Sequence, residues 1–307
     1  MTIQKKIDLR LLSYFQTTVE TGNITAAARA LNVAQPTLSK ALKLLESQLR
    51  VTLLVRSAHG VAPTLFGERL MRHARLVTAQ VGAALDEVES LRTGAAGKVT
   101  VGAGPSWVRR MLPEAVARLL QERPGVDVTV ITGFDNRLLE GLEDGQLDFV
   151  VTERPLSGED VDYTYRELSR DDLVVCARRE HPLADGRRPT LEEALAVRWA
   201  LPHEATLARR KLAGRLAILG VAQPAQVLIS NSITFLMNYA RRADALVYTT
   251  RSMLATPEAV GLVELALPDL VSNREAGLVI RKGALLTPTA EALAAHMKAV
   301  CAQDSVN

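Results

Sequence analysis

Hydrophobic residues follow two different periods along the chain, one before and one after residues 93–97. In residues 9–92, apolar positions recur every three or four residues, which is the period of an amphipathic helix. After residue 97, short apolar runs such as 126–131 and 173–177 alternate with helical segments. Such alternation is typical of a mainly parallel sheet covered by helices. The pattern therefore predicts a helical N-terminal part and an α/β C-terminal part.

Two short helices joined by a tight turn are predicted near the N-terminus. Gly22 ends the first helix of the chain, and the side chain of Asn23 can cap the alanine-rich helix 24–31. After the turn 32–34, Pro36 stands in the first turn of another helix, where its missing N–H costs nothing. The small residues of 24–31 let the next helix approach closely. This combination predicts a helix-turn-helix.

The second of these helices carries its polar side chains on the face opposite its leucines. Amide, hydroxyl and ammonium groups reach base edges and phosphates when a helix lies in the major groove of DNA. Glutamine suits adenine and lysine suits phosphate, although any one such residue alone is more often part of a solvated face. The set consists of Gln35, Thr37, Ser39, Lys40 and Lys43.

Charge is unevenly distributed along the chain. Residues 1–67 contain eight Lys and Arg against three acidic residues, whereas the remaining 240 residues contain 29 basic and 31 acidic ones. A basic head on a near-neutral body is expected when only the head contacts a polyanion. Together with the turn, this favours DNA binding over a solvated helix face.

Four motifs in this head resemble the signature of the LysR-type transcriptional regulators. They are NITAAARALNVAQPTLS at residues 23–39, LE at 45–46, LLVR at 53–56 and TLFG at 64–67. The resemblance extends from about residue 9 to the C-terminal helix. It implies a winged helix-turn-helix DNA-binding domain at 7–64, in which the DNA-facing residues are Thr25, Gln35, Pro36, Thr37, Ser39, Lys40 and, in the wing, Arg56. Lys43, from the polar helix face, is expected to join them.

Three positions depart from the usual LysR pattern. Ala34 stands where a capping serine is common, so this helix start loses a side-chain acceptor. Arg50 replaces the usual glycine after the recognition helix, where a left-handed backbone conformation is easiest for glycine. Leu54 replaces a common phenylalanine and stays apolar. None of these changes removes a DNA-facing residue.

Residues 65–93 are predicted to form a long linker helix with a coiled-coil seam. Apolar residues recur three and four apart at Leu70, Ala74, Val77, Val81, Leu85, Val88 and Leu91. The seam can pack on its own chain or on a second copy. The resemblance implies the second: linker helices pair into a homodimer, and dimers assemble into a homotetramer.

The C-terminal part, residues 97–303, resembles a two-lobed, periplasmic-binding-protein-like α/β domain that binds a small-molecule effector between its lobes. The resemblance places lobe I at about 97–168 and 269–303 and lobe II at about 169–268. Ligands of open α/β sheets bind where strands end. We therefore expect the effector site to be lined by Ser106, Trp107, Thr132, His203, Ser230 and Asn231.

The expected effector is a small organic acid, a carboxylate or another organic anion, because the segment after the strand 98–102 leads to a helix start beside the Ser106 hydroxyl. A plain strand-to-helix turn capped by Ser106 is the alternative. The segment is not a dinucleotide fingerprint, because Trp107 stands where the third glycine belongs. Trp107 can equally be a core residue.

Neither catalysis nor a metal site is indicated by the sequence. The five histidines are scattered, and no HExxH, GxSxG or P-loop motif is present, so no catalytic residue, metal ligand or cofactor is expected. Cys176 and Cys301 are far apart and are interpreted as structural thiols. A solute-binding or enzyme-like cleft protein and a purely architectural DNA binder remain the alternatives.

The expected location is the cytoplasm, because no secretory signal is recognised and no apolar run approaches the roughly 18 residues of a membrane helix. The expected partners are double-stranded DNA and further copies of the chain, with RNA polymerase as an additional candidate.

Overall fold

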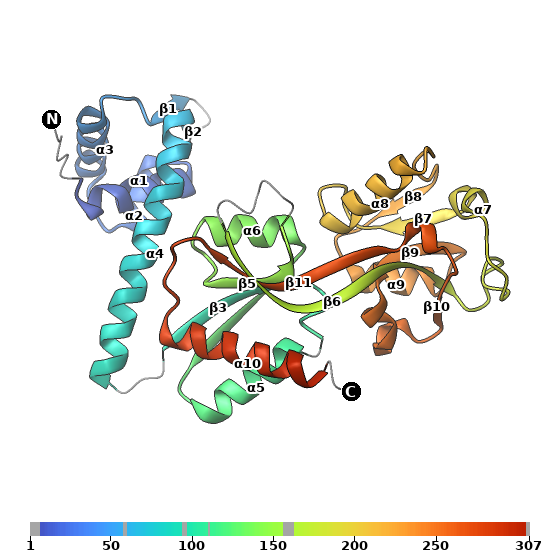
Figure 1. Cartoon of the computed structure of the whole chain (residues 1–307). Helices are drawn as coiled ribbons and strands as arrows, with labels where there is room; N and C mark the ends of the chain where they lie inside the picture. Colours follow the sequence, from blue (N-terminus) through green and yellow to red (C-terminus); the bar gives the residue numbers. More distant parts are fainter. Residues whose placement is uncertain (1–6, 58–59, 94–96, 110, 156–162, 305–307) are drawn as a thin grey trace. The chain divides into compact units, whose positions relative to one another are not determined.

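The computed structural model describes residues 7–57, 60–93, 97–109, 111–155 and 163–304 of the 307-residue chain (Figure 1). The chain divides into two compact units, of which the first comprises residues 1–94 with 143–146 and the second comprises the rest.

The N-terminal unit is a three-helix head with a two-stranded wing and a long helix. Its elements are α1 (Leu9–Thr21), α2 (Ile24–Ala30), α3 (Gln35–Leu49), β1 (Leu54–Ser57), β2 (Gly60–Pro63) and α4 (Leu65–Thr93). β1 and β2 form an antiparallel hairpin in which Leu54 is opposite Pro63. The order helix, helix, helix, hairpin is that of a winged helix-turn-helix.

The helix ends in the head have the causes predicted from the sequence. Gly22 ends α1 in a left-handed conformation, with φ 62°. The Asn23 side chain accepts hydrogen bonds from the N–H groups of Thr25 and Ala26, at 2.8 and 3.1 Å. Ala34 provides no side-chain cap to α3, and Arg50 ends that helix at φ 59°. An arginine therefore adopts the left-handed backbone for which glycine is usual.

The head has a core of its own, built around Phe15 of α1 and Leu38 and Leu45 of α3, all fully buried. The carboxylate of Glu46 joins α3 to the wing, because it accepts hydrogen bonds from the N–H groups of Leu53 and Leu54 at 2.8 and 3.2 Å. These two hydrogen bonds satisfy two backbone donors and fix where β1 begins.

The C-terminal unit contains one long sheet and the helices that pack on it. Its strands are β3 (Lys98–Ala103), β4 (Asp127–Thr132), β5 (Phe149–Glu153), β6 (Tyr163–Arg178), β7 (Arg198–Leu201), β8 (Val227–Ile229), β9 (Ala245–Thr250), β10 (Leu262–Glu264) and β11 (Ser272–Arg281). Its α-helices are α5 (Met111–Glu122), α6 (Asp135–Glu143), α7 (Leu191–Ala196), α8 (Leu207–Ile218), α9 (Ile233–Ala240) and α10 (Pro288–Asp304), with short 3₁₀ helices η1 (Arg251–Ala255), η2 (Pro257–Ala259) and η3 (Pro268–Leu270).

The strand order in the sheet is β4-β3-β5-β11-β6-β9-β7-β8, with β10 paired to β6. β3 is parallel to β4 and β5, and β7 is parallel to β8 and β9. In the middle, β6 and β11 are antiparallel to each other and to the neighbouring strands β5 and β9. The sheet is therefore mixed, which corrects the expectation of a mainly parallel one.

The two lobes of this unit share β6 and β11, which run from one lobe into the other (Figure 1). Lobe I is built on β3, β4 and β5, and lobe II on β7, β8 and β9. A register shift in the β6–β11 ladder falls between Ala276 and Gly277. A Cβ at Gly277 would lie 2.1 Å from the carbonyl oxygen of Arg166, so only glycine fits this close approach of the two strands.

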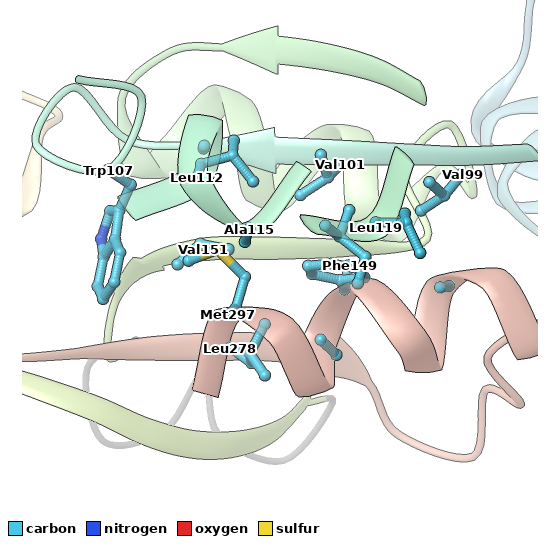
Figure 2. Packing of buried hydrophobic residues seen from close by; sticks show 14 of the residues in the cluster. Val99, Val101, Trp107, Leu112, Ala115, Leu119, Phe149, Val151, Leu278 and Met297 are labelled. Carbon is cyan, nitrogen blue, oxygen red and sulfur yellow. The ribbon is translucent and has the colours of Figure 1, made fainter. Parts of the chain in front are cut away.

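The core of lobe I lies between the sheet and the helices α5 and α10. Val101, Phe149 and Met297 are fully buried there, and Figure 2 shows Trp107 in the same cluster. Trp107 is 2 % exposed. The indole ring of Trp107 therefore packs in the hydrophobic core, which is the second of the two roles that the sequence allowed.

The segment after β3 is a turn rather than the start of a helix. Residues 105–109 form this turn, and α5 begins only at Met111. Ser106 lies within this turn, five residues before the first described residue of α5, and so does not stand at a helix-cap position.

Polar contacts connect the lobes on either side of β6 and β11. The buried carboxylate of Asp135, the first residue of α6, accepts a hydrogen bond from the N–H of Leu207, the first residue of α8, at 2.9 Å. Glu153 at the end of β5 forms ion pairs with Lys211 of α8 and, at 3.4 Å, with Arg274 of β11. These contacts connect α6 and β5 of lobe I with α8 of lobe II.

The core position of Trp107 leads to a stability prediction. We expect Trp107→Ala to lower the free energy of unfolding by about 3–5 kcal/mol, because it removes a large buried ring and leaves a cavity. Trp107→Phe should cost less, since it keeps much of the apolar volume. Thermal or urea unfolding measures both, with the exposed Leu285→Ala as the control expected to change little. Equal stability of Trp107→Ala and the wild type would contradict the core assignment.

The buried Asp135 leads to a prediction about pH. Burial raises the pKa of Asp135, and the hydrogen bond from Leu207 offsets this only in part. Ionising Asp135 therefore costs folding free energy, and this cost appears as pH rises from the ordinary aspartate pKa, about 4, through the raised value. We expect Asp135→Asn to melt at a higher temperature than the wild type at pH 7 and at a similar temperature below pH about 4.

Glu140→Gln, an exposed change on the same helix, is the control for the Asp135 prediction. Melting curves at the two pH values measure it. A gain of the same size at both pH values would show that ionisation of Asp135 is not its cause.

Candidate DNA interface and ligand cavity

The exposed face of α3 carries the side chains that the sequence analysis selected for DNA contact. Leu38, Leu42 and Leu45 are buried on the opposite face. The amide of Gln35 donates a hydrogen bond to the Ser39 hydroxyl at 3.2 Å. The structure therefore gathers onto one surface Gln35, Pro36, Thr37, Ser39, Lys40 and Lys43, of which all but the half-buried Ser39 are exposed.

Two further predicted contacts come from other elements of the head. Thr25 is exposed in the first turn of α2, where its backbone N–H is bound by the Asn23 cap. Arg56 lies in β1 opposite Val61 of β2, so it belongs to the wing hairpin. Sequence reasoning did not select Arg29, which is exposed in the last turn of α2.

Two adjoining cavities lie between the lobes of the C-terminal unit, with volumes of about 1030 and 70 Å³. They share the lining residues Pro105, Ser106, Phe134, Ile233 and Met253, and so form an outer and an inner part of one cleft. The outer cavity is large enough for a small organic molecule, and the inner one extends it by the space of a small polar group.

The structure brings together three of the six residues expected at the effector site. Ser106, Thr132 and Asn231 line the outer cavity, and Ser106 also lines the inner one. They come from the turn after β3, the end of β4 and the segment between β8 and α9. Their convergence follows from the rule that ligands bind beyond the ends of strands in such sheets.

The other three expected residues lie elsewhere. Trp107 is in the core of lobe I. His203 is exposed, and its Nδ1 accepts a hydrogen bond from the Ala205 N–H at 3.3 Å. The hydroxyl of Ser230 accepts one from the Ser232 N–H at 3.1 Å. His203 and Ser230 line neither cavity, because each side chain folds back onto its own loop and fixes the local turn.

Arg109 bridges the two lobes inside the outer cavity. Its Nη1 lies 2.5 Å from Glu258 Oε1, and its Nη2 donates a hydrogen bond to the Thr234 hydroxyl at 2.8 Å. Its Nε is buried and has no hydrogen-bond partner among the described residues. The pKa of Glu258 is lowered, first by a hydrogen bond from its own backbone N–H and then by the charge of Arg109. Glu258 is therefore ionised at neutral pH.

The start of α9 also faces the outer cavity. Asn231, Ser232, Ile233 and Thr234 line it, and Ser232 caps the helix by accepting a hydrogen bond from the Phe235 N–H at 3.2 Å. The N–H groups at a helix start carry partial positive charge. Together with Arg109, this makes one side of the cavity favourable for an anion.

The inner cavity contains buried groups of both signs. Asp135, Glu153 and Arg274 line it. Arg274 pairs with Glu153 and donates a hydrogen bond to the Ser106 hydroxyl at 3.4 Å. Sequence reasoning missed these residues and also Arg109, Thr234 and Glu258, because each is an ordinary polar residue in its local sequence and the fold alone brings them together.

Other kinds of site have no counterpart in the described part of the chain. No cluster of His, Cys, Asp or Glu among the described residues is placed to hold a metal ion. No described helix combines the length and apolar character needed to cross a membrane. Cys176 and Cys301 are both buried, and burial raises the pKa of the Cys176 thiol far above its usual range.

Comparison with protein families gives two matches that together cover nearly the whole chain. Residues 9–68 match the bacterial regulatory helix-turn-helix family of the LysR type. Residues 92–302 match the LysR substrate-binding domain.

Individual relatives agree with the family matches. The chain is 30 % identical over 299 residues to the HTH-type transcriptional regulator GalR of Pseudomonas putida, covering 96 % of this chain and 75 % of GalR. It is 32 % identical over 291 residues to the SDS degradation transcriptional activation protein of a Pseudomonas species, covering 93 % and 94 % of the two chains. Full-length CbnR bound to its target DNA superposes with a TM-score of 0.63 at 20 % identity, covering 96 % of this chain and all of that one, which shows a common fold.

The exposed polar face of a helix-turn-helix, a two-lobed domain with a cleft, and both family matches lead to one conclusion. The chain belongs to the LysR family and is a DNA-binding transcription regulator with a substrate-binding domain, a role that is not enzymatic.

Proposed function

We propose that this regulator reads its operator with α3 and is controlled by a small organic anion bound between the two lobes. The observation that carries the proposal is the position of Arg109, the only basic residue among the described residues that line the outer cavity. Its guanidinium and the start of α9 attract a carboxylate from two sides. Apolar neighbours such as Val108, Met111 and Ile233 can cover the rest of a small or aromatic acid.

On the DNA side, we propose that residues 7–64 form the DNA-binding domain. Gln35, Thr37 and Ser39 would reach base edges in the major groove, whereas Lys40 and Lys43 would contact phosphates. Pro36, Thr25 and Arg56 complete the proposed interface. The exposure of Gln35, Thr37, Lys40 and Lys43 on one face of α3 supports this assignment, as does the place of Arg56 in the wing hairpin.

For assembly, we propose that residues 65–93 pair two copies into a homodimer, and that dimers form a homotetramer. The second half of α4 supports the pairing, because Val77, Val81, Leu85 and Val88 are 40, 37, 65 and 63 % exposed in the single chain. An exposed apolar stripe at this spacing is what a coiled-coil partner would cover. RNA polymerase is a further candidate partner.

For control, we propose that residues 97–303 bind the effector and that the bound effector changes the bend imposed on DNA. A ligand shifts an equilibrium between two states only by its difference in affinity for them. Arg109 contacts Thr234 and Glu258 across the cleft. A ligand that changes such contacts between the lobes would bind the two states with different affinity.

For DNA recognition, we expect Gln35→Ala and Lys43→Ala to differ in kind. Gln35→Ala should lose roughly 1–3 kcal/mol of binding free energy at the base that Gln35 prefers, and should bind sequences that differ at this base more equally. Lys43→Ala should weaken binding to all sequences alike and lower the slope of log affinity against log salt by about 1. Selection from random DNA followed by titrations at several salt concentrations measures both.

The wild type should select an interrupted inverted repeat, as expected for a dimer with two recognition helices. An unchanged sequence profile for Gln35→Ala would remove it from the base-reading set. Wild-type binding without sequence preference would instead indicate an architectural DNA binder.

For the effector, we expect the wild type to bind simple carboxylates more tightly than the corresponding neutral amides. Calorimetric titration with benzoate and benzamide tests this. Arg109→Gln should lower the affinity for benzoate roughly 10–100-fold, because a charged hydrogen bond is lost. Arg118→Gln, on α5 in the same lobe, is the control. Footprints with and without benzoate test the proposed effect on DNA.

If benzoate and a range of other carboxylates bind no better than their amides, the organic-anion effector is wrong. Unchanged benzoate affinity in Arg109→Gln would place the anion elsewhere in the cleft.

A further inference from the structure

Arg109 already has a carboxylate partner inside the outer cavity. Glu258 lies in η2 of lobe II, whereas Arg109 lies in the turn after β3 of lobe I, and both line the cavity. The side chain of Glu258 is 32 % exposed and that of Arg109 is 15 % exposed, so the pair is partly shielded from water. A carboxylate of the protein itself is therefore already paired with the guanidinium that a ligand carboxylate would need.

Glu258 contacts only some of the N–H donors of the Arg109 guanidinium. One carboxylate oxygen contacts Nη1, Thr234 binds Nη2, and the buried Nε has no partner among the described residues. A guanidinium presents five N–H donors in a planar fork and binds a carboxylate best through two of its nitrogens at once. A free ligand can take this two-point geometry, whereas Glu258, attached to η2, contacts the guanidinium through a single nitrogen.

The charges of the outer cavity disfavour the binding of a second carboxylate beside Glu258. Among the described lining residues Arg109 is the only basic one and Glu258 the only acidic one. An anion that entered while Glu258 stayed in place would meet a like charge in a shielded site, where repulsion is stronger than in water. Without Glu258, the same cavity would carry an unpaired cation.

We propose that Glu258 is an internal substitute for the effector's carboxylate: it holds Arg109 when no effector is bound, and an organic anion binds by taking Arg109 from it. The inference rests on the proposed organic-anion effector and adds a residue that sets its affinity. Because Arg109 and Glu258 come from different lobes, the exchange of partners also removes one connection between the lobes. Ligand binding and the change in the lobes' contact are then one event.

The test is Glu258→Gln, which removes the charge and keeps the size of the side chain. Calorimetric titration of the full-length protein with benzoate should show binding about tenfold tighter than in the wild type, because the competing charge is gone. Benzamide, which has the same shape and no charge, should bind both proteins equally. The double variant Arg109→Gln with Glu258→Gln should lose the gain.

Lys211→Gln is the matched control, because it breaks another ion pair between the lobes, with Glu153, and Lys211 does not line the outer cavity. It should leave benzoate affinity unchanged. Circular dichroism and melting curves establish that each variant is folded.

The outcomes separate the two proposals. If the wild type binds benzoate through Arg109 and Glu258→Gln binds it equally or more weakly, the substitute role of Glu258 is overturned and the effector site stands. If Lys211→Gln tightens binding as much as Glu258→Gln does, loosening of the lobes is the cause, and the proposal is overturned as well. If no variant prefers carboxylates over amides, the organic-anion effector fails, and this inference fails with it.

Discussion

The antiparallel pairing of β6 with β11 is the constraint on which the C-terminal unit depends. The ladder extends from Leu173 opposite Ser272 to Tyr163 opposite Arg281. One part of β11 also pairs with β5 in lobe I, and one part of β6 with β9 in lobe II. Each lobe is thus completed by strands that it shares with the other. Any rearrangement that separated β6 from β11 would therefore break the backbone hydrogen bonds of this ladder.

Within that frame, charged groups connect the two lobes across the cleft. Asp135 binds a backbone N–H, Glu153 pairs with Lys211 and Arg274, and Arg109 pairs with Glu258. Buried ion pairs add little net stability, because desolvation offsets much of their attraction. Their partners are nevertheless specific, since a buried charge left alone is costly. A cleft built this way can exchange one partner for another at small net cost, which suits a site that has to respond to a ligand.

The head was predictable in detail because its signals are local. Asn23 and Gly22 determine the ends of α1 and α2 through bonds within three or four residues, and Arg50 takes the left-handed conformation expected at its position. The cleft was predictable only where strands end, as at Thr132. Arg109 and Glu258 are 149 residues apart, so only the tertiary fold pairs them. The first half of β6 was not predicted as a strand, because its largely polar sequence lacks the apolar run that identifies a buried strand.

The sequence pattern predicted one apolar seam along the long helix α4. In the structure, the two halves of this helix have different surroundings. Met71 and Ala74 are buried in the head, and the Thr78 hydroxyl donates a hydrogen bond to Gln16 of α1 at 3.1 Å. In the second half, Val77, Val81, Leu85 and Val88 are exposed. The first turns of α4 are therefore fixed to the same core that holds α3. A helix cannot rotate in one half without the other, so any partner that packs on the exposed half is placed in a defined orientation relative to the recognition helix. The spacing between two recognition helices would then follow from packing inside each head as much as from the contact between the two α4 helices.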